Sequence, residues 1–357
     1  MVGNMSLVLL RVSKLLALSF LLVAGAAQVL AADSDSDFYK NKQIVIYVGT
    51  TPGDAYDLFA RTLVHFIGKY IPGDPTFVIQ YMPGAGGLIV SNYMYNSAPR
   101  DGTVIAAPTQ SIPTASLLAP SGVRYDPTQF SWIGSITKDV FVAYTWNTSS
   151  IVTVDDLRTK QGIFGANGVG SAGIDFPLVV RDILGLKLKV IPGYADQISV
   201  RLAMERGEID GSFGNGWTSL NSTQPTWVSD HKIHLLTQFG FERDPDIPAD
   251  VPVLLDLVKN EPDRQALQLV TARQEFSKPY VAPPGVPPER LAILRKAFDA
   301  TVKDPDFIEA AKQANLEING PMNGADLAAL ALKLSQTPPA VVERISTIFK
   351  NFQRGDQ

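Results

Sequence analysis

Short apolar runs rich in β-branched and aromatic residues alternate along the chain with segments whose apolar residues recur at helical spacing. The first run predicts a buried strand over 43–49, and the pattern over 57–70 predicts a helix. The same unit returns with predicted strands over 77–81 and 103–107 on either side of a predicted helix over 88–97. This alternation is typical of parallel sheets whose strands are joined by crossover helices.

A second series of alternating elements begins near residue 140. Its strands are expected over 140–146, 162–166, 188–191 and 208–213, and its helices over 153–160, 176–184 and 197–206. After a proline-rich link, the pattern is helical over 289–302, 305–314, 324–334 and 339–352. We therefore predict an α/β fold of two hinged lobes, with 32–139 and 273–357 in lobe 1 and 140–272 in lobe 2.

The N-terminal segment has the layout of a secretory signal. Arg11 and Lys14 precede an uncharged apolar run over 15–30, and small residues crowd the end of this run. The alternative is a membrane anchor, but the run of about 16 residues is shorter than the roughly 20 needed to span a bilayer. We expect cleavage after Ala31, export, and a mature protein in the periplasm.

Composition narrows the possible partners and chemistry. Removing residues 1–31 takes away two basic residues and no acidic one, so the formal net charge of −4 becomes −6. A mildly acidic chain without a basic cluster argues against nucleic acid and anionic lipid as partners. The chain has no cysteine, which excludes disulfides, thiolate catalysis and thiolate metal sites.

Several turns between predicted strands and helices are rich in glycine, and they lie at 52–56, 83–87, 165–173 and 192–195. Glycine lets the backbone approach a ligand, and the free N–H groups of the following helix favour a carboxylate or phosphate. In a two-lobed α/β protein, such turns are expected to face one another across the cleft. Asn215 and Trp217 follow a predicted strand and could reach the same place, although Trp217 could equally serve in packing.

Catalytic and cofactor motifs are sparse. The stretch 168–173 matches the dinucleotide pattern G-x-G-x-x-G, but Lys187 and Lys189 stand where the ribose-binding acid is expected. The histidines, at positions 65, 231 and 234, are scattered and lack the spacing of a metal site. Asp54 with Asp57 is the one candidate acid–base pair, and we expect Asp57 to cap its helix instead. We predict no catalytic residue, metal or cofactor, and therefore a binding protein and not an enzyme.

Six ordered motifs resemble those of the Bug family, the periplasmic solute receptors of tripartite tricarboxylate transporters. They are P-G-x-x-x-D-x-x-A-R at 52–61, P-G-A-G-G at 83–87, G-x-G-S at 168–171, G-x-[IV]-D at 207–210, a link similar to A-P-x-G-T-P-P at 282–288, and D-P-x-F at 304–307. The resemblance covers nearly the whole mature chain. It implies a type-2 periplasmic-binding-protein (Venus flytrap) fold that closes around a small carboxylate and delivers it to a large and a small membrane subunit.

The turns and the resemblance together give a set of candidate ligand-binding residues. They are Pro52, Gly53, Asp54, Tyr56, Asp57, Ala85, Gly86 and Gly87 in the first lobe, and Gly168, Gly170, Ser171, Ala172, Tyr194, Asn215 and Trp217 in the second. In the family, the G-x-G-S loop holds a carboxylate through backbone N–H groups and the serine hydroxyl, which implies that role for Ser171.

The first-lobe loop departs from the family pattern P-G-G-G-[ST]-D, because Asp54, Ala55 and Tyr56 replace its central residues. A carboxylate at position 54 would repel an anionic ligand unless it turns outward. Tyr56 could form an aromatic wall, which favours an aromatic or partly apolar carboxylate over citrate. We expect the protein to be a monomer. Two functions are alternatives to transport: the ligand-binding partner of a sensor kinase, and an envelope enzyme on the same fold.

Overall fold

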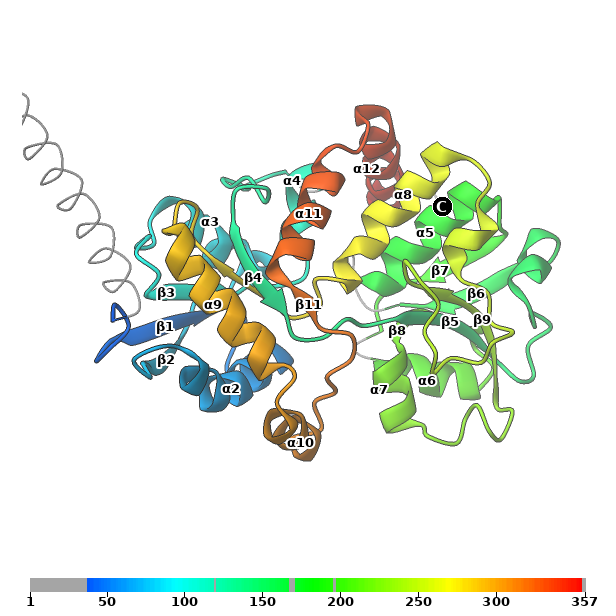
Figure 1. Cartoon of the computed structure of the whole chain (residues 1–357). Helices are drawn as coiled ribbons and strands as arrows, with labels where there is room; N and C mark the ends of the chain where they lie inside the picture. The colour runs from blue at the N-terminus through cyan, green and yellow to red at the C-terminus, as the bar shows by residue number, and fades with distance from the viewer. Residues whose placement is uncertain (1–36, 119, 167–170, 195–196, 355–357) are drawn as a thin grey trace, which may run out of the picture.

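The computed structural model describes residues 37–118, 120–166, 171–194 and 197–354. The described chain forms two α/β lobes that lie side by side, each built on its own sheet (Figure 1). The predicted fold class is therefore confirmed. The predicted secretory signal and the cleavage position lie outside the described residues. Among the helices of the described part, none is both long and apolar enough to span a membrane.

The first lobe contains a six-stranded sheet in the order β11-β4-β10-β3-β1-β2. Its strands are β1 (Gln43–Val48), β2 (Thr76–Tyr81), β3 (Val104–Ala107), β4 (Ser131–Ser135), β10 (Pro279–Ala282) and β11 (Met322–Asn323). Strand β1 is parallel to β2 and β3, whereas β10 runs antiparallel to β3 and β4. The helices around this sheet are α2 (Ala55–Ile67), α3 (Leu88–Asn96), α4 (Ile112–Leu118), α9 (Pro288–Thr301), α10 (Pro305–Gln313) and α11 (Gly324–Ser335).

The second lobe contains a five-stranded sheet in the order β7-β6-β8-β5-β9. Its strands are β5 (Phe141–Trp146), β6 (Gly162–Gly165), β7 (Leu188–Ile191), β8 (Gly211–Gly216) and β9 (Ile233–Phe239). Strand β6 is parallel to β7 and β8, and β5 is antiparallel to β8 and β9. Its helices are α5 (Ala172–Leu184), α6 (Gln197–Glu205), α7 (Trp217–Thr223) and α8 (Glu261–Thr271). The predicted helix over 153–160 is a short 3₁₀ helix, Val154–Arg158, capped by Thr153.

Two neighbouring crossings join the sheets, and backbone hydrogen bonds hold them together. Residues 136–140 lead from β4 to β5, and residues 275–278 return from the second lobe to β10. The N–H of Ile136 donates to the carbonyl of Lys278 at 3.1 Å, and the N–H of Asp139 donates to that of Gln274 at 3.3 Å. The Gln274 side chain accepts a further bond from the N–H of Phe141 at 2.9 Å. The crossings therefore form one ribbon at the base of both lobes.

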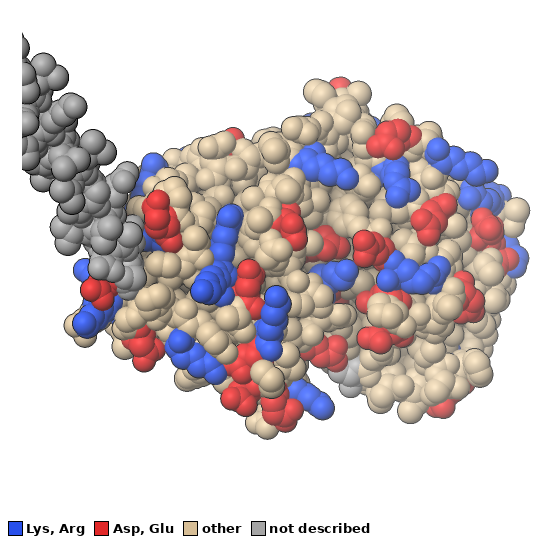
Figure 2. Space-filling model, in the orientation of Figure 1, with Lys and Arg blue, Asp and Glu red and all other residues tan. Residues whose placement is uncertain are grey.

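The last helix, α12 (Pro339–Arg354), follows α11 after a short link but packs against α5 and α8, and it also touches α4 (Figure 1). Arg344 ties it down through ion pairs with Asp182 of α5 and Asp263 of α8. Helix α12 therefore contacts helices of both lobes. The predicted lobe boundaries stay a prediction. Acidic and basic side chains are interspersed over the face shown in Figure 2.

The sheet of the first lobe packs closely against α9 at Gly134 of β4. A methyl group at this position would overlap the ring of the buried Phe298. We therefore expect Gly134→Ala to lower the free energy of unfolding by about 1–3 kcal/mol, measured by urea denaturation. Phe298→Leu frees space beside residue 134, so the double variant should lose less stability than the two single losses combined. Strict additivity of the two losses would contradict this packing.

Candidate functional site

The first glycine-rich turn is held from inside by a buried carboxylate. Asp57, with 1% of its side chain exposed, accepts hydrogen bonds from the N–H of Gly53 at 2.7 Å and from the hydroxyl of Tyr81 at 2.8 Å. It also forms an ion pair with Arg61 at 2.9 Å. Burial alone would raise the pKa of Asp57, but these three partners outweigh it and hold the pKa below its usual range. The carboxylate is engaged inside the lobe and fixes the turn.

The expectation that Asp57 caps its helix was wrong. Helix α2 begins at Ala55, and its N-cap is Asp54, whose Oδ1 accepts the N–H of Tyr56 at 2.8 Å. Asp57 is the third helical residue, from which its side chain turns back to the loop at Gly53. The exposed carboxylate of Asp54 thus has a local role as a cap. Pro52 and Gly53 are exposed beside it.

Tyr56 is half-buried and engaged on its hydroxyl and on its ring. The hydroxyl accepts the N–H of Gln110 at 3.0 Å, and burial raises the pKa of the phenol. The Nζ of Lys278 lies 4.6 Å from the centre of its ring, within the range of a cation–π contact. Lys278 comes from the returning crossing between the lobes, so the ring of Tyr56 connects α2 to that crossing.

The second turn places Ala85 and Gly86 at the surface and Gly87 in the interior. The carbonyl of Gly86 accepts hydrogen bonds from the hydroxyls of Thr109 at 2.5 Å and Ser111 at 3.2 Å. Gly87 has a φ of +90°, and a Cβ there would lie 2.7 Å from the Thr109 hydroxyl. Only glycine fits that position, which keeps the start of α3 close to the loop after β3.

In the second lobe, Ser171 is the N-cap of α5. Its Oγ is buried and has no hydrogen-bond partner among the described residues. Ala172, the first residue of α5, packs against the end of β8, because a Cβ on Gly214 would meet its backbone at 2.7 Å. Gly168 and Gly170 lie outside the described residues.

The remaining predicted residues of this lobe differ in how they are placed. Asn215 is buried, and its amide donates to the hydroxyl of Tyr144 at 2.6 Å, so it is engaged within the lobe. Tyr194 is partly buried against the core that includes Val200 and Ile209. Trp217 is 5% exposed and packs in the same core, yet its Nε1–H is buried and finds no acceptor within the described part of the chain.

Several buried polar atoms that the sequence did not point to also lack partners among the described residues. They are Thr50 Oγ1, Asp139 Oδ1, Gln274 Nε2 and Tyr280 Oη, in addition to Ser171 Oγ and Trp217 Nε1. Leaving such an atom unpaired costs about 1–3 kcal/mol, so a group of them is typical of a site that a ligand completes. Thr50 follows β1, Asp139 lies on the first crossing, and Gln274 directly precedes the second, so the group includes the place where the two sheets are joined.

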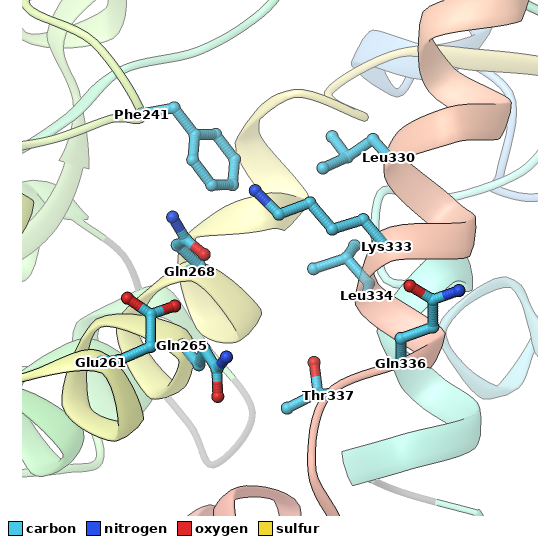
Figure 3. Close-up of a pocket in the computed structure, with 9 residues that line it drawn as sticks. All are labelled: Phe241, Glu261, Gln265, Gln268, Leu330, Lys333, Leu334, Gln336 and Thr337. Atoms are coloured by element: carbon cyan, nitrogen blue, oxygen red, sulfur yellow. The ribbon is translucent and has the colours of Figure 1, made fainter.

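Two further observations limit the chemistry. Within the described ranges, no three His, Asp or Glu side chains come together as a metal site. A hollow lies between α8 and α11 (Figure 3), with the side chains of Gln265, Gln268, Gln336 and Lys333 at its wall. It contains none of the predicted ligand-binding residues. The unpaired polar atoms, and not this hollow, therefore define the candidate site.

Comparison with known proteins agrees with the two-lobed fold. No protein-family model matches the chain. A relative from Cupriavidus necator, described as "UPF0065 protein in gbd 5'region", is 24% identical over 326 residues, which cover 88% of this chain and 91% of the relative.

Solved structures with the same fold include the following three. A TctC solute-binding protein from Polaromonas, without ligand, has a TM-score of 0.68 and 17% identity, covering 88% of this chain and 99% of its own. The periplasmic binding protein BugD has a TM-score of 0.54 and 20% identity, covering 87% and 98%. MatC from Rhodopseudomonas palustris with bound malate has a TM-score of 0.53 and 17% identity, covering 86% and 99%.

The chain therefore has the two-lobed fold of periplasmic solute-binding proteins. Since its neighbours are TctC- and Bug-type proteins, the resemblance to the Bug family that its motifs indicate is confirmed.

The network around Asp57 predicts a pH-dependent contribution to stability. Because the pKa of Asp57 is lower in the folded state, its stabilisation is present above the unfolded pKa near 3.8 and is lost as the pH falls through the folded value. We expect Asp57→Asn to lower the free energy of unfolding by about 1–3 kcal/mol at neutral pH, and this difference should shrink below about pH 4.

Denaturant unfolding across this pH range measures the effect. Asp54→Asn is the matched control, because asparagine also caps helices and should change stability by only a few tenths of a kcal/mol. A loss for Asp57→Asn that is independent of pH would contradict the assigned role of the carboxylate.

Proposed function

We propose that this protein is a periplasmic solute-binding protein that captures a small carboxylate between its lobes. Ser171 carries the proposal, since its buried hydroxyl has no partner among the described residues and lies at the N-terminus of α5, an end that favours anions. Ala172 and, across the cleft, the turns at 52–54 and 85–87 would complete the pocket. The malate-bound MatC structure supports carboxylates as the ligand class.

The rest of the proposal concerns where the protein acts and with which partners. Ligand bound to both lobes favours the closed state by its higher affinity for that state. The closed surface would then be recognised by the large and small membrane subunits of a tripartite tricarboxylate-type transporter. In this role the protein binds its cargo without transforming it and needs no cofactor. The preference for an aromatic carboxylate stays a prediction that depends on Tyr56 and Trp217.

Ligand binding can be tested by thermal shift with a broad panel of mono- and dicarboxylates. We expect at least one to raise the melting temperature, because binding to the folded state alone stabilises it. Ser171→Trp should abolish this shift by filling the space at the start of α5. Ser150→Trp, in the exposed turn after β5, is the control and should retain the shift. A panel that leaves the melting curve of the unmodified protein unmoved would refute carboxylate binding.

Export gives an independent prediction. Expressed with its full N-terminus in a Gram-negative host, the protein should be recovered from the periplasmic fraction with Ala32 as its first residue. Replacing Arg11 and Lys14 by glutamate should retain the protein in the cytoplasm with an uncleaved N-terminus. N-terminal sequencing of each fraction measures both outcomes, and an uncleaved chain in the membrane fraction would indicate an anchor instead.

A further inference from the structure

Asp139 stands on the first crossing between the lobes, against the second lobe. A Cβ on Gly216 would lie 2.8 Å from one carboxylate oxygen of Asp139 and 2.9 Å from the other, so this carboxylate packs directly over the junction of β8 and α7. The neighbouring residue Val140 accepts the backbone N–H of Trp217 at 2.7 Å. Asp139 is therefore fixed beside Trp217, whose Nε1–H is one of the unpaired buried groups.

Asp139 also interacts with Lys278 and Tyr56. Lys278, whose Nζ covers the ring of Tyr56, is the cation that acts on the Asp139 carboxylate, and the charge of Asp139 acts in turn on Tyr56. Asp139 thus has Gly216 of the second lobe packed against its carboxylate, and it interacts electrostatically with Lys278 of the returning crossing and Tyr56 of the first lobe.

Asp139 is partly exposed, but one oxygen of its carboxylate is buried without being satisfied. The structure shows no hydrogen bond or ion pair between this side chain and any described residue, and Oδ1 is fully buried. Burial raises the pKa of Asp139 to about 6, with Lys278 opposing this shift and Glu317 and Asp244 adding to it. At neutral pH the group is therefore mostly ionised. A buried, ionised carboxylate requires a donor, preferably a cation.

The surrounding charge favours a cationic donor. Asp244 and Glu317 act on Asp139, and Asp54 acts on Lys278, which is the cation that acts on Asp139. Burial also lowers the pKa of Lys278, and the two acids Asp139 and Asp54 counter this effect. Acids thus surround the Asp139–Lys278 pair, whereas the start of α5 with Ser171 favours a negative group.

We propose that Asp139 is a specificity-determining residue that selects carboxylates carrying a protonated amine. The carboxylate of the cargo binds at Ser171 and the start of α5, and its ammonium group donates to the unpaired oxygen of Asp139. This inference rests on the proposed carboxylate-binding function. It adds a positively charged group to the carboxylate ligand that this function already assumes.

The test uses pairs of compounds that differ only in the amino group. The pairs are β-alanine with propionate, 4-aminobutyrate with butyrate, 5-aminovalerate with valerate, and 4-(aminomethyl)benzoate with 4-methylbenzoate. Calorimetric titration of the mature protein at neutral pH should show at least one amine bound about tenfold or more tightly than its partner. Its affinity should fall as the pH drops below about 6, where Asp139 becomes protonated.

Asp139→Asn keeps the shape of the side chain and removes its charge. This variant should lose the preference for the amine and its pH dependence, while binding of the amine-free partner stays within about threefold of the unmodified protein. Glu317→Gln is the matched control, since it removes an exposed acid of the same neighbourhood and should keep the preference.

Three results would overturn the inference. They are amine-free partners that bind as tightly as the amines, a preference that survives Asp139→Asn, and a complete absence of amine binding. In each case the broader carboxylate panel decides separately whether the proposed function also fails. If carboxylates without an amine still shift the melting temperature and Ser171→Trp abolishes that shift, only the role of Asp139 is refuted.

Discussion

The site depends on the hydrogen-bonded ribbon formed by the two crossings between the sheets. Gln274 accepts N–H groups from Asp139 and Phe141, and Lys278 accepts that of Ile136. The ribbon uses the backbone carbonyls of Gln274 and Lys278 and the Oε1 of Gln274, so the carboxylate of Asp139, the Nε2 of Gln274 and the Nζ of Lys278 take no part in it. The crossings between the lobes therefore combine a fixed frame with polar groups that the frame itself does not use.

Charge is distributed unequally around this frame. In the first lobe, the carboxylate of Asp57 accepts hydrogen bonds from Gly53 and Tyr81 and forms an ion pair with Arg61. The carboxylate of Asp54 caps α2. Neither acid is thus a free base, although the exposed Asp54 still contributes a negative field. In the second lobe, the start of α5 offers the opposite polarity. A bound ligand would lie near both the acids of the first lobe and the start of α5. Its affinity should therefore depend on where its charge lies along the molecule as much as on its net charge.

The sequence predicted the parallel parts of both sheets because their strands are apolar runs followed by glycine turns, as at β1 and β6. In the first lobe it missed β4, β10 and β11, which pair with partners distant in the chain and carry glycine, proline or only two residues. It also misassigned the helix cap, since Asp54 and Asp57 are both good capping residues and only the start of α2 decides between them.

In the candidate site, too, local sequence predicts some residues, and contacts between distant segments determine others. Ser171 could be found from its motif and its place before a helix. Asp139 could not, because its burial arises where two crossings and the β8–α7 junction meet, and no local pattern around it signals that meeting. Asn215 looked equally suitable in sequence, but Tyr144 takes up its amide inside the lobe.

The short link between α11 and α12 has a mechanical consequence. Helix α11 packs on β4 of the first lobe, α12 packs on α5 and α8 of the second, and only residues 336–338 separate them. Three residues can reach at most about 10 Å when fully extended. A third covalent connection thus joins the two lobes besides the ribbon, and its length limits how far they can separate.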